Sequence, residues 1–176
     1  MTFTEAAKNK LFQIAKSSIE AGLEGKKYNP EPDPELEGKY GVFVTLKIND
    51  QLRGCIGYIQ PIKPLYQAVS EMAYAAAFSD PRFPPVTKEE VKRLRFEITI
   101  LSPLERIHDI NQIEVGKHGL FIKKGVFQGL LLPQVAIEEN WDRMTFLRHT
   151  CLKAGLPEDG WHDAEIYTFT GTILKE

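Results

Sequence analysis

The sequence predicts an α+β fold in which helices cover one side of a mainly antiparallel sheet that curls towards a barrel. Hairpins alternate with amphipathic helices along the chain, a mixture typical of α+β proteins. The order strand–strand–helix–helix–strand occurs twice, at about residues 42–102 and 118–174, which indicates two β-β-α-α-β-like repeats from an internal duplication. With 176 residues, 43% of them hydrophobic, the chain can bury a core, and we expect a single domain over residues 1–176.

The first helix is expected at about residues 4–23. Thr2 and Glu5 have the spacing of a capping box, apolar residues follow a helical period, and Gly25 ends the pattern. Residues 28–39 contain three prolines on alternate positions, which excludes a helix or a central strand there. We interpret this segment as an extended strap that is ordered only where it lies on the body of the protein.

The first repeat opens with a hairpin whose turn is Asn49 and Asp50, between two stretches of alternating apolar residues. Three prolines make residues 80–85 irregular, and Thr87 and Glu90 form a capping box for a short helix. The expected elements are strands at 42–48 and 52–59, helices at 65–77 and 87–94, and a strand at 95–100.

The second repeat follows the same plan. Lys124 and Gly125 form the hairpin turn, Pro133 stands at the favoured first position of a helix, and Gly155 ends the next helix. The expected elements are strands at 119–123 and 126–132, helices at 133–140 and 142–154, and a final strand at 165–174.

Charge and composition exclude several classes of protein. The net charge of -2 argues against a dedicated nucleic-acid or membrane-surface binder, and no apolar run is long enough to span a bilayer. No glycine-rich loop of a phosphate-binding type is present, so no cofactor is expected. The first ten residues lack the apolar core of a signal peptide, so we expect a cytoplasmic protein whose two cysteines, Cys55 and Cys151, are reduced.

The stretch LRGCIG at residues 52–57 is the first candidate site. Gly54 and Gly57 would weaken an ordinary strand, so they indicate a β-bulge or a close approach by a ligand or another backbone. In a regular strand Arg53 and Cys55 share one face. The opposite face would then carry Leu52, Ile56 and Tyr58.

Two interpretations of Cys55 follow. Arg53 on the same face would favour a reactive thiolate, and His118 would be the histidine best placed to act as its general base. The alternative is a buried thiol that packs as a small apolar group, with His118 capping backbone groups of a turn. Cys151 lies in an apolar helical stripe, and we expect it to pack in the core.

The stretch DPRFPP at residues 80–85 is the second candidate. Asp80 is expected to form an Asx-type turn and Phe83 to anchor the loop by burial, with Pro84 as part of the same structural motif. Arg82 has two interpretations, a structural ion pair or bidentate binding of an anionic group in a cleft beside Cys55, Gly54 and Gly57. Gln134, at a helix start, would either cap the backbone or contact the same ligand.

Two histidine–aspartate pairs stand apart in the sequence. They are His108 with Asp109 and His162 with Asp163. A metal site needs three or four ligands that converge, and nothing in the sequence indicates that these pairs meet. We therefore expect no metal site.

Several motifs together resemble those of the AMMECR family. They are LRGCIG and DPRFPP, followed by KHGL at 117–120, LLPQVA at 131–136, Trp141, and KAGLP at 153–157. The resemblance runs from the first helix to the last strand and implies an α+β fold with two β-β-α-α-β-like repeats. Prokaryotic members often accompany a Memo-like protein and a radical S-adenosylmethionine protein, the AmmeMemoRadiSam grouping. The resemblance implies no particular reaction.

Three functions are consistent with these observations. The first is a binding or scaffold protein that acts with a Memo-like protein and a radical S-adenosylmethionine protein, and the incomplete acid–base set favours it. The second is a small-molecule enzyme that uses Cys55 with Arg53 and His118. The third is a nucleic-acid-associated factor, which the near-neutral charge disfavours.

Overall fold

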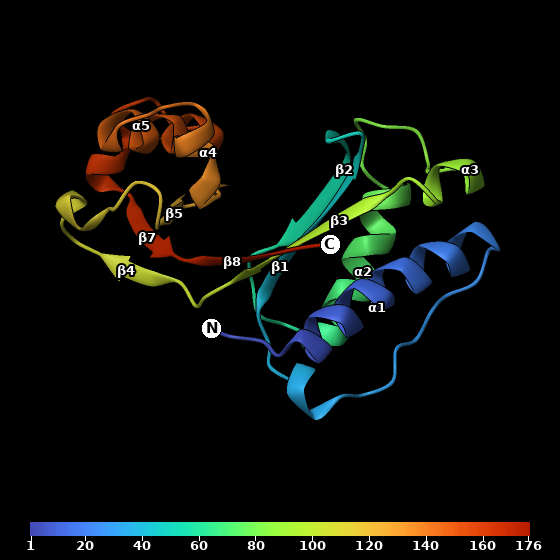
Figure 1. Cartoon of the computed structure of the whole chain (residues 1–176). Helices are drawn as coiled ribbons and strands as arrows, with labels where there is room; N and C mark the ends of the chain where they lie inside the picture. The colour runs from blue at the N-terminus through green and yellow to red at the C-terminus, as the bar shows by residue number, and fades with distance from the viewer. The chain divides into compact units, whose positions relative to one another are not determined.

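Two units make up the computed structural model, which describes residues 1–176. The first unit contains Met1–Leu101 and Thr172–Glu176, and the second contains Ser102–Gly171. Figure 1 shows the elements of each unit along the chain. None of the helices combines the length and the apolar character needed to cross a membrane.

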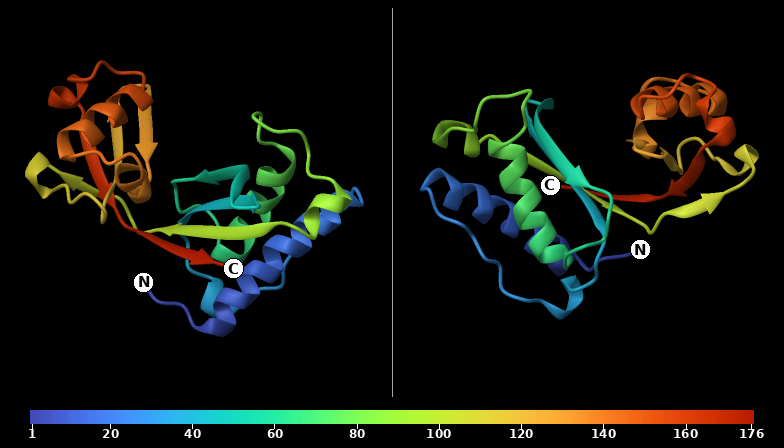
Figure 2. Two further views of the ribbon diagram at one scale, coloured as in Figure 1. Left: turned by 45° about the horizontal axis from the view of Figure 1, so that its top comes forward. Right: turned by 180° about the vertical axis from the view of Figure 1, so that it is seen from behind.

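The first unit is a four-stranded sheet with helices on one face. Its strands are β1 (Gly41–Ile48), β2 (Gln51–Tyr58), β3 (Arg95–Leu101) and β8 (Gly171–Lys175), in the order β2-β1-β3-β8. Its helices are α1 (Glu5–Leu23), α2 (Leu65–Phe78) and the short α3 (Lys88–Val91). Figure 2 shows α1 and α2 beside the sheet, and apolar side chains of both helices form one core with alternate residues of the strands. The two helices therefore cover the same face.

The start of α1 differs in detail from the capping box predicted at Thr2 and Glu5. Thr4 is the N-cap, and its hydroxyl oxygen accepts a hydrogen bond from the Ala7 N–H at 3.1 Å. The Thr4 hydroxyl also donates to the Glu35 carboxylate at 2.8 Å. Thr4 is therefore fixed from both sides, whereas Thr2 lies before the helix.

The second unit has its own sheet and core. Its strands are β4 (Glu105–Ile107), β5 (Gly119–Lys124), β6 (Phe127–Leu131) and β7 (Glu165–Phe169), in the order β4-β7-β5-β6. Its helices are α4 (Pro133–Glu138) and α5 (Arg143–Lys153), with 3-10 turns η2 (Ile110–Gln112) and η3 (Gly160–Asp163). A separate cluster of buried apolar residues from α5, β5 and β7 forms the core of this unit.

The α+β class and the two repeats are confirmed. The first unit contains β1-β2-α2-α3-β3 and the second contains β5-β6-α4-α5-β7, and the strand orders β2-β1-β3 and β6-β5-β7 correspond. The prediction of a single curled sheet is wrong, because the strands form two separate four-stranded sheets. In each sheet the free edge of the third strand is occupied by a fourth strand, β8 beside β3 and β4 beside β7, so each sheet is completed within its own unit.

The predicted last strand, 165–174, is divided into β7 and β8. The break falls at Thr170, whose carbonyl oxygen accepts the Ser102 N–H at 2.9 Å and whose N–H donates to the Ser102 hydroxyl oxygen at 2.8 Å. Thr170 is therefore bonded to the segment after β3.

The short strand β4 was not predicted. Because β4 is only three residues long, alternation could not reveal it in the sequence.

The strap at 28–39 is anchored mainly in its second half. The 3-10 turn η1 (Pro34–Leu36) buries Leu36 completely, and Asp33 pairs with Lys10 at 2.6 Å. Lys26 and Lys27, before the strap, are exposed and lie outside any helix or strand.

We expect limited proteolysis of the native protein to begin at residues 26–32. Proteases cut exposed, extended backbone before hydrogen-bonded helices. The measurement is brief digestion with proteinase K, followed by mass spectrometry of the first fragments. A first cut inside α2 would contradict this reading of the strap.

Candidate functional site

LRGCIG contains a β-bulge, as the glycines indicated. Lys47 of β1 pairs with Leu52 of β2, but Leu46 pairs with Gly54, so Arg53 has no residue opposite. A Cβ atom on Gly54 would clash with the carbonyl oxygen of Ala76 in α2. The bulge and glycine together let the backbone of β2 approach the backbone of α2, which confirms the expected close approach by another backbone.

The bulge changes which side chains share a face. Ile56 and Tyr58 pack against the core of the first unit, as predicted. Leu52 does not join them, since it pairs with Lys47 ahead of the extra residue and is 42% exposed. The face assignment from strict alternation is therefore wrong at Leu52, because one inserted residue reverses the alternation.

Arg53 is buried and bonded to the loop and to α3. Its Nη2 donates to the carbonyl oxygen of Pro84 at 2.9 Å and to the Glu90 carboxylate at 2.9 Å. Burial alone would raise the pKa of Glu90, but hydrogen bonds from Arg53 and from the Thr87 N–H outweigh it and lower that pKa. Arg53 Nη1 is buried without a hydrogen-bond partner. The guanidinium thus ties the bulge to the segment 84–90.

Asp80 holds the outer edge of β2. Its carboxylate accepts the Cys55 N–H at 3.0 Å and the Arg82 N–H at 3.0 Å, and it is bonded to the Arg82 guanidinium at 2.8 Å. Arg82 Nη2 also donates to the carbonyl oxygen of Cys55 at 3.4 Å. Because β2 is an edge strand, Asp80 and Arg82 occupy backbone groups that another strand would otherwise bind. We call this pair the edge clamp.

The ion pair of the edge clamp shifts the pKa of both of its members. The hydrogen bond from Arg82 holds the pKa of Asp80 well below its usual range, and the same bond raises the pKa of Arg82. Asp80 is 4% exposed, whereas the side chain of Arg82 is 55% exposed. Asp80 is therefore an internal anchor, and Arg82 presents a large part of its surface outside.

Phe83 lies close to two guanidinium groups. The Cζ atoms of Arg53 and Arg82 are 5.9 Å and 5.6 Å from the centre of its ring, which is cation–π distance. Phe83 is only half-buried, and the buried anchor of the loop is Val86, whose N–H donates to the Ala77 carbonyl oxygen at 2.9 Å. The predicted anchoring by burial of Phe83 is thus performed by Val86.

Cys55 is half-buried and faces away from the helices. Its Sγ lies 3.1 Å from the hydroxyl oxygen of Thr45, the residue opposite on β1. The neighbours of Thr45, Val44 and Leu46, are in the core, so Thr45 and Cys55 lie on the other face of the sheet. Gly57 is on this face too, where the Phe43 ring fills the space beside its Cα.

The remaining candidates belong to the second unit. His118 Nδ1 accepts the Glu114 N–H at 3.1 Å, which is the turn-capping arrangement. Gln134 is the second residue of α4, and its Oε1 is buried without a hydrogen-bond partner. Cys151 is completely buried, as predicted, and burial raises the pKa of its thiol. The structure therefore brings Arg53, Cys55, Asp80, Arg82, Phe83 and Pro84 together in the first unit, whereas His118 and Gln134 belong to the second unit.

Sequence reasoning missed Thr45 and Glu90 as members of this site. Glu90 was recognised only as the acid of a capping box with Thr87, and it performs that role while also binding Arg53. Thr45 could have been found only from the hairpin register, which the bulge shifts by one residue.

Comparison with known proteins gives one consistent match. A family model described as AMMECR1 matches residues 12–174. Protein NEQ441 of Nanoarchaeum equitans is 47% identical over 177 residues, covering 94% of this chain and 98% of that protein. Protein MK0488 of Methanopyrus kandleri is 45% identical, covering 94% and 86%. The crystal structure of an uncharacterised protein, PH0010 from Pyrococcus horikoshii, is 45% identical and has a TM-score of 0.88, covering 94% of this chain and 89% of that one.

Proposed function

The chain belongs to the AMMECR1 family, and on that premise we propose that it is a binding or scaffold protein of the cytoplasm. Its partners would be a Memo-like protein and a radical S-adenosylmethionine protein. The observation that supports a binding role is that the charged groups of LRGCIG and DPRFPP are bonded to one another and to the chain around them. Such a network stiffens a surface, but it leaves no acid–base pair on the Cys55 thiol.

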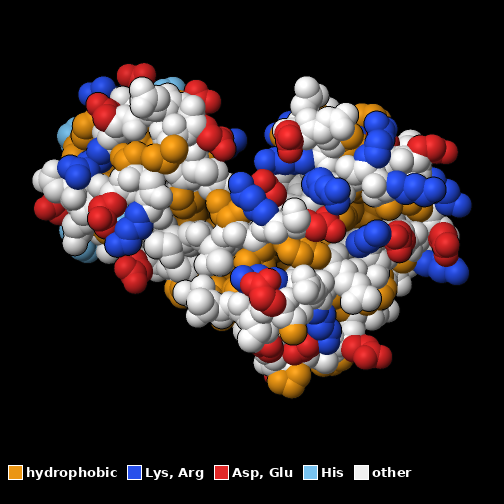
Figure 3. All heavy atoms as spheres, viewed as in Figure 1, with side chains coloured by type: hydrophobic (Ala, Val, Ile, Leu, Met, Phe, Trp, Pro, Cys, Tyr) orange, Lys and Arg blue, Asp and Glu red, His pale blue; other side chains and the backbone are white.

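The stretches LRGCIG and DPRFPP display residue types that protein interfaces favour. Arg82, Phe83 and Leu52 are each at least partly exposed, and aromatic and arginine side chains often dominate binding energy. Because the buried Asp80 carboxylate holds the Arg82 guanidinium in place, the Arg82 side chain would lose little conformational entropy when a partner binds it. On the face drawn in Figure 3, the Lys and Arg side chains around α3 have acidic side chains among them, so this face carries no continuous basic surface for nucleic acid.

The test is direct binding of the purified protein to the Memo-like and the radical S-adenosylmethionine proteins of the same organism, by isothermal calorimetry. We expect Leu52→Asp to weaken binding by about tenfold or more, a loss of about 1.4 kcal/mol. Ile62→Asp is the matched control, since Ile62 is an exposed apolar residue of the same unit outside the motifs. Absence of binding by both proteins, or equal effects of the two variants, would contradict the proposal.

A second candidate is an enzyme that uses Cys55, and the partly accessible thiol beside Thr45 favours it. Incubation with a metabolite extract, followed by mass spectrometry, would then show a consumed metabolite or a thiol adduct that Cys55→Ser abolishes. No change in either would exclude this role.

We expect iodoacetamide to label Cys55 in the native protein far faster than Cys151. Cys55 is half-buried, whereas Cys151 is fully enclosed and burial raises its thiol pKa, which lowers the thiolate fraction. The measurement is the labelling rate at each cysteine by peptide mass spectrometry. After denaturation the two rates should converge, and equal native rates would be the opposing result.

A further inference from the structure

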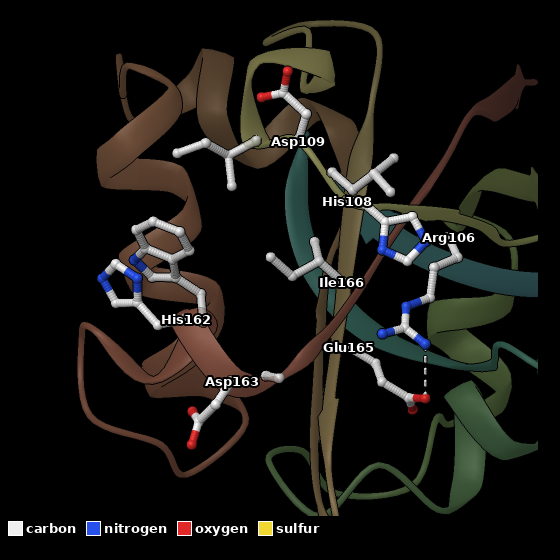
Figure 4. Close-up of a pocket in the computed structure, with 11 residues that line it drawn as sticks. Arg106, His108, Asp109, His162, Asp163, Glu165 and Ile166 are labelled. Atoms are coloured by element: carbon white, nitrogen blue, oxygen red, sulfur yellow. Dashed lines mark hydrogen bonds and ion pairs between the residues drawn. The ribbon is translucent and has the colours of Figure 1, made fainter.

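The two histidine–aspartate pairs, separate in the sequence, line one pocket of the second unit. β4 pairs antiparallel with β7, and Ile107 lies opposite Ile166. The segments 106–110 and 161–166 therefore run side by side and line a pocket of about 360 Å³ (Figure 4). No group of three or more His, Cys, Asp or Glu side chains is arranged there to hold a metal ion.

The charged groups of that pocket are bonded within the protein. Glu165 pairs with Arg106 at 3.0 Å, and Asp163 pairs with Lys124 at 2.6 Å. The Asp109 carboxylate accepts a backbone N–H of η2 at 2.9 Å and points away from the pocket in Figure 4. No Asp, Glu, Lys or Arg side chain is therefore left for a charged ligand inside the pocket. A cavity of the first unit differs in this respect.

That cavity lies among the helices α1 and α2 and the start of the strap, and it measures about 470 Å³. A smaller cavity of about 210 Å³ adjoins it, because both are lined by Lys27, Tyr28, Ser70 and Glu71. Both helices are held by the core of the first unit, whereas residues 26–30 belong to no helix or strand. The cavity therefore has two fixed walls and a third wall of extended chain.

Two tyrosine side chains give the cavity aromatic walls. Tyr28 is partly buried and packs against the core, and Tyr74 contributes a ring that is supported by Phe78, with ring centres 4.9 Å apart. Gly22 of α1 leaves the space that Tyr74 and Phe78 occupy, since a Cβ atom there would clash with both rings. Aromatic walls suit a ligand with an aromatic body, and the volume suits one or two rings.

Ser70 offers the cavity a hydroxyl group that the protein does not use. Ser70 is 4% exposed, and its carbonyl oxygen accepts the Ser18 hydroxyl at 2.7 Å. The Ser70 hydroxyl itself makes no hydrogen bond within the protein, whereas the buried Thr150 hydroxyl donates to the carbonyl oxygen one turn earlier at 2.7 Å. Because buried hydroxyl groups usually have a partner, an acceptor placed in the cavity would complete Ser70.

Lys27 is the cation of the cavity without a partner. Glu71 pairs with Lys63 at 2.6 Å, and Lys26 pairs with Glu24 at 3.4 Å. Lys27 lines both cavities and makes no hydrogen bond or ion pair. The lining therefore carries one positive charge that the protein leaves unbalanced.

We propose that this cavity binds a small carboxylic acid with an aromatic body. The ring would lie against Tyr28 and Tyr74, and the carboxylate would accept hydrogen bonds from the Ser70 hydroxyl and the Lys27 ammonium group. Because Lys27 and Tyr28 are adjacent in the chain, the ligand would hold the start of the strap against α2. The proposal concerns these two helices and the strap, and it does not depend on the partner role of LRGCIG.

The test compares 3-phenylpropanoate with 3-phenylpropan-1-ol, which has the same ring and chain but no charge. Saturation-transfer NMR on the unmodified protein reports binding of each compound. We expect saturable binding of the acid and at least about tenfold weaker binding of the alcohol. Equal affinity for the two compounds would overturn the proposal.

Brief digestion with proteinase K gives a second readout that reports where the acid binds. At saturation the acid should slow the first cut at residues 26–32 severalfold, because the bound ligand holds this segment on the helices. Saturable binding with no change in the rate of this cut would place the acid elsewhere on the protein, which would also overturn the proposal.

Two variants test the groups that would hold the carboxylate. In Lys27→Gln, which removes the charge, the acid should bind no more tightly than the alcohol. In Ser70→Ala, which removes the hydroxyl but keeps a good helix former, the acid should bind at least about threefold more weakly. The control is Lys16→Gln, which neutralises an exposed lysine of α1 outside both cavities and should leave binding unchanged. An unchanged preference in Lys27→Gln, or an equal loss in Lys16→Gln, would contradict the proposed site.

Discussion

Replacing Gly54 with alanine is expected to lower the free energy of unfolding by about 3 kcal/mol or more. The added methyl group would clash with the carbonyl oxygen of Ala76, which belongs to the backbone of α2 and cannot rotate away. Either α2 or the bulge of β2 must move, and both contribute to the core of the first unit. The measurement is denaturant unfolding followed by far-UV circular dichroism, since Trp141 and Trp161 both lie in the second unit and would report on that unit only.

Gly25→Ala is the matched control for this substitution. Gly25 has a φ of +70° and nothing within 4 Å of an added Cβ, so alanine there should cost only the left-handed backbone penalty, about 1 kcal/mol. Similar losses in the two variants would mean that the first unit adapts to the extra methyl group. In that case Gly54 would not be required for the approach of α2.

The local features of this fold follow from the sequence because they depend on near neighbours. Periodicity located β1, β2 and the helices α1, α2 and α5, and two glycines indicated the bulge in β2. The sequence alone does not show which residue of β2 is the extra one. Either Leu52 or Arg53 fits the alternating pattern until the pairing register with β1 is known. Because of this one inserted residue, the predicted face of Leu52 is wrong, although the strand itself is predicted correctly.

The features that sequence reasoning did not find depend on contacts between distant segments. Glu90 binds Arg53 across 37 positions, and each residue has an ordinary local explanation. The pocket beside His108 and Asp163 exists only because β4 pairs with β7, and a three-residue strand carries no detectable periodicity. In both cases the residue types were noticed and their partners were not.

Replacing Asp80 with alanine is expected to lower the free energy of unfolding by about 3 kcal/mol. Asp80 is almost fully buried, and its loss leaves the Cys55 N–H without its partner and releases the loop at Arg82. Arg82→Ala is the comparison, with a loss of about 1 kcal/mol, because the Arg82 side chain is largely exposed and Asp80 keeps its bonds to the two backbone N–H groups. Equal losses would place the stability in the ion pair rather than in the bonds to the backbone.

The contribution of Asp80 should depend on pH in one direction. Its pKa in the folded protein is depressed by Arg82, below the value of about 3.9 expected in the unfolded chain. The unfolded state therefore takes up the proton first as the pH falls, so the stabilisation is fully present above about pH 5 and is lost progressively below about pH 4. Asp80→Asn cannot ionise, so its deficit relative to the unmodified protein should be constant from pH 5 to pH 8 and should shrink in acid. Unfolding curves measured at each pH test this, and a deficit that stays constant down to pH 2 would show that Asp80 acts through its shape and not through its charge.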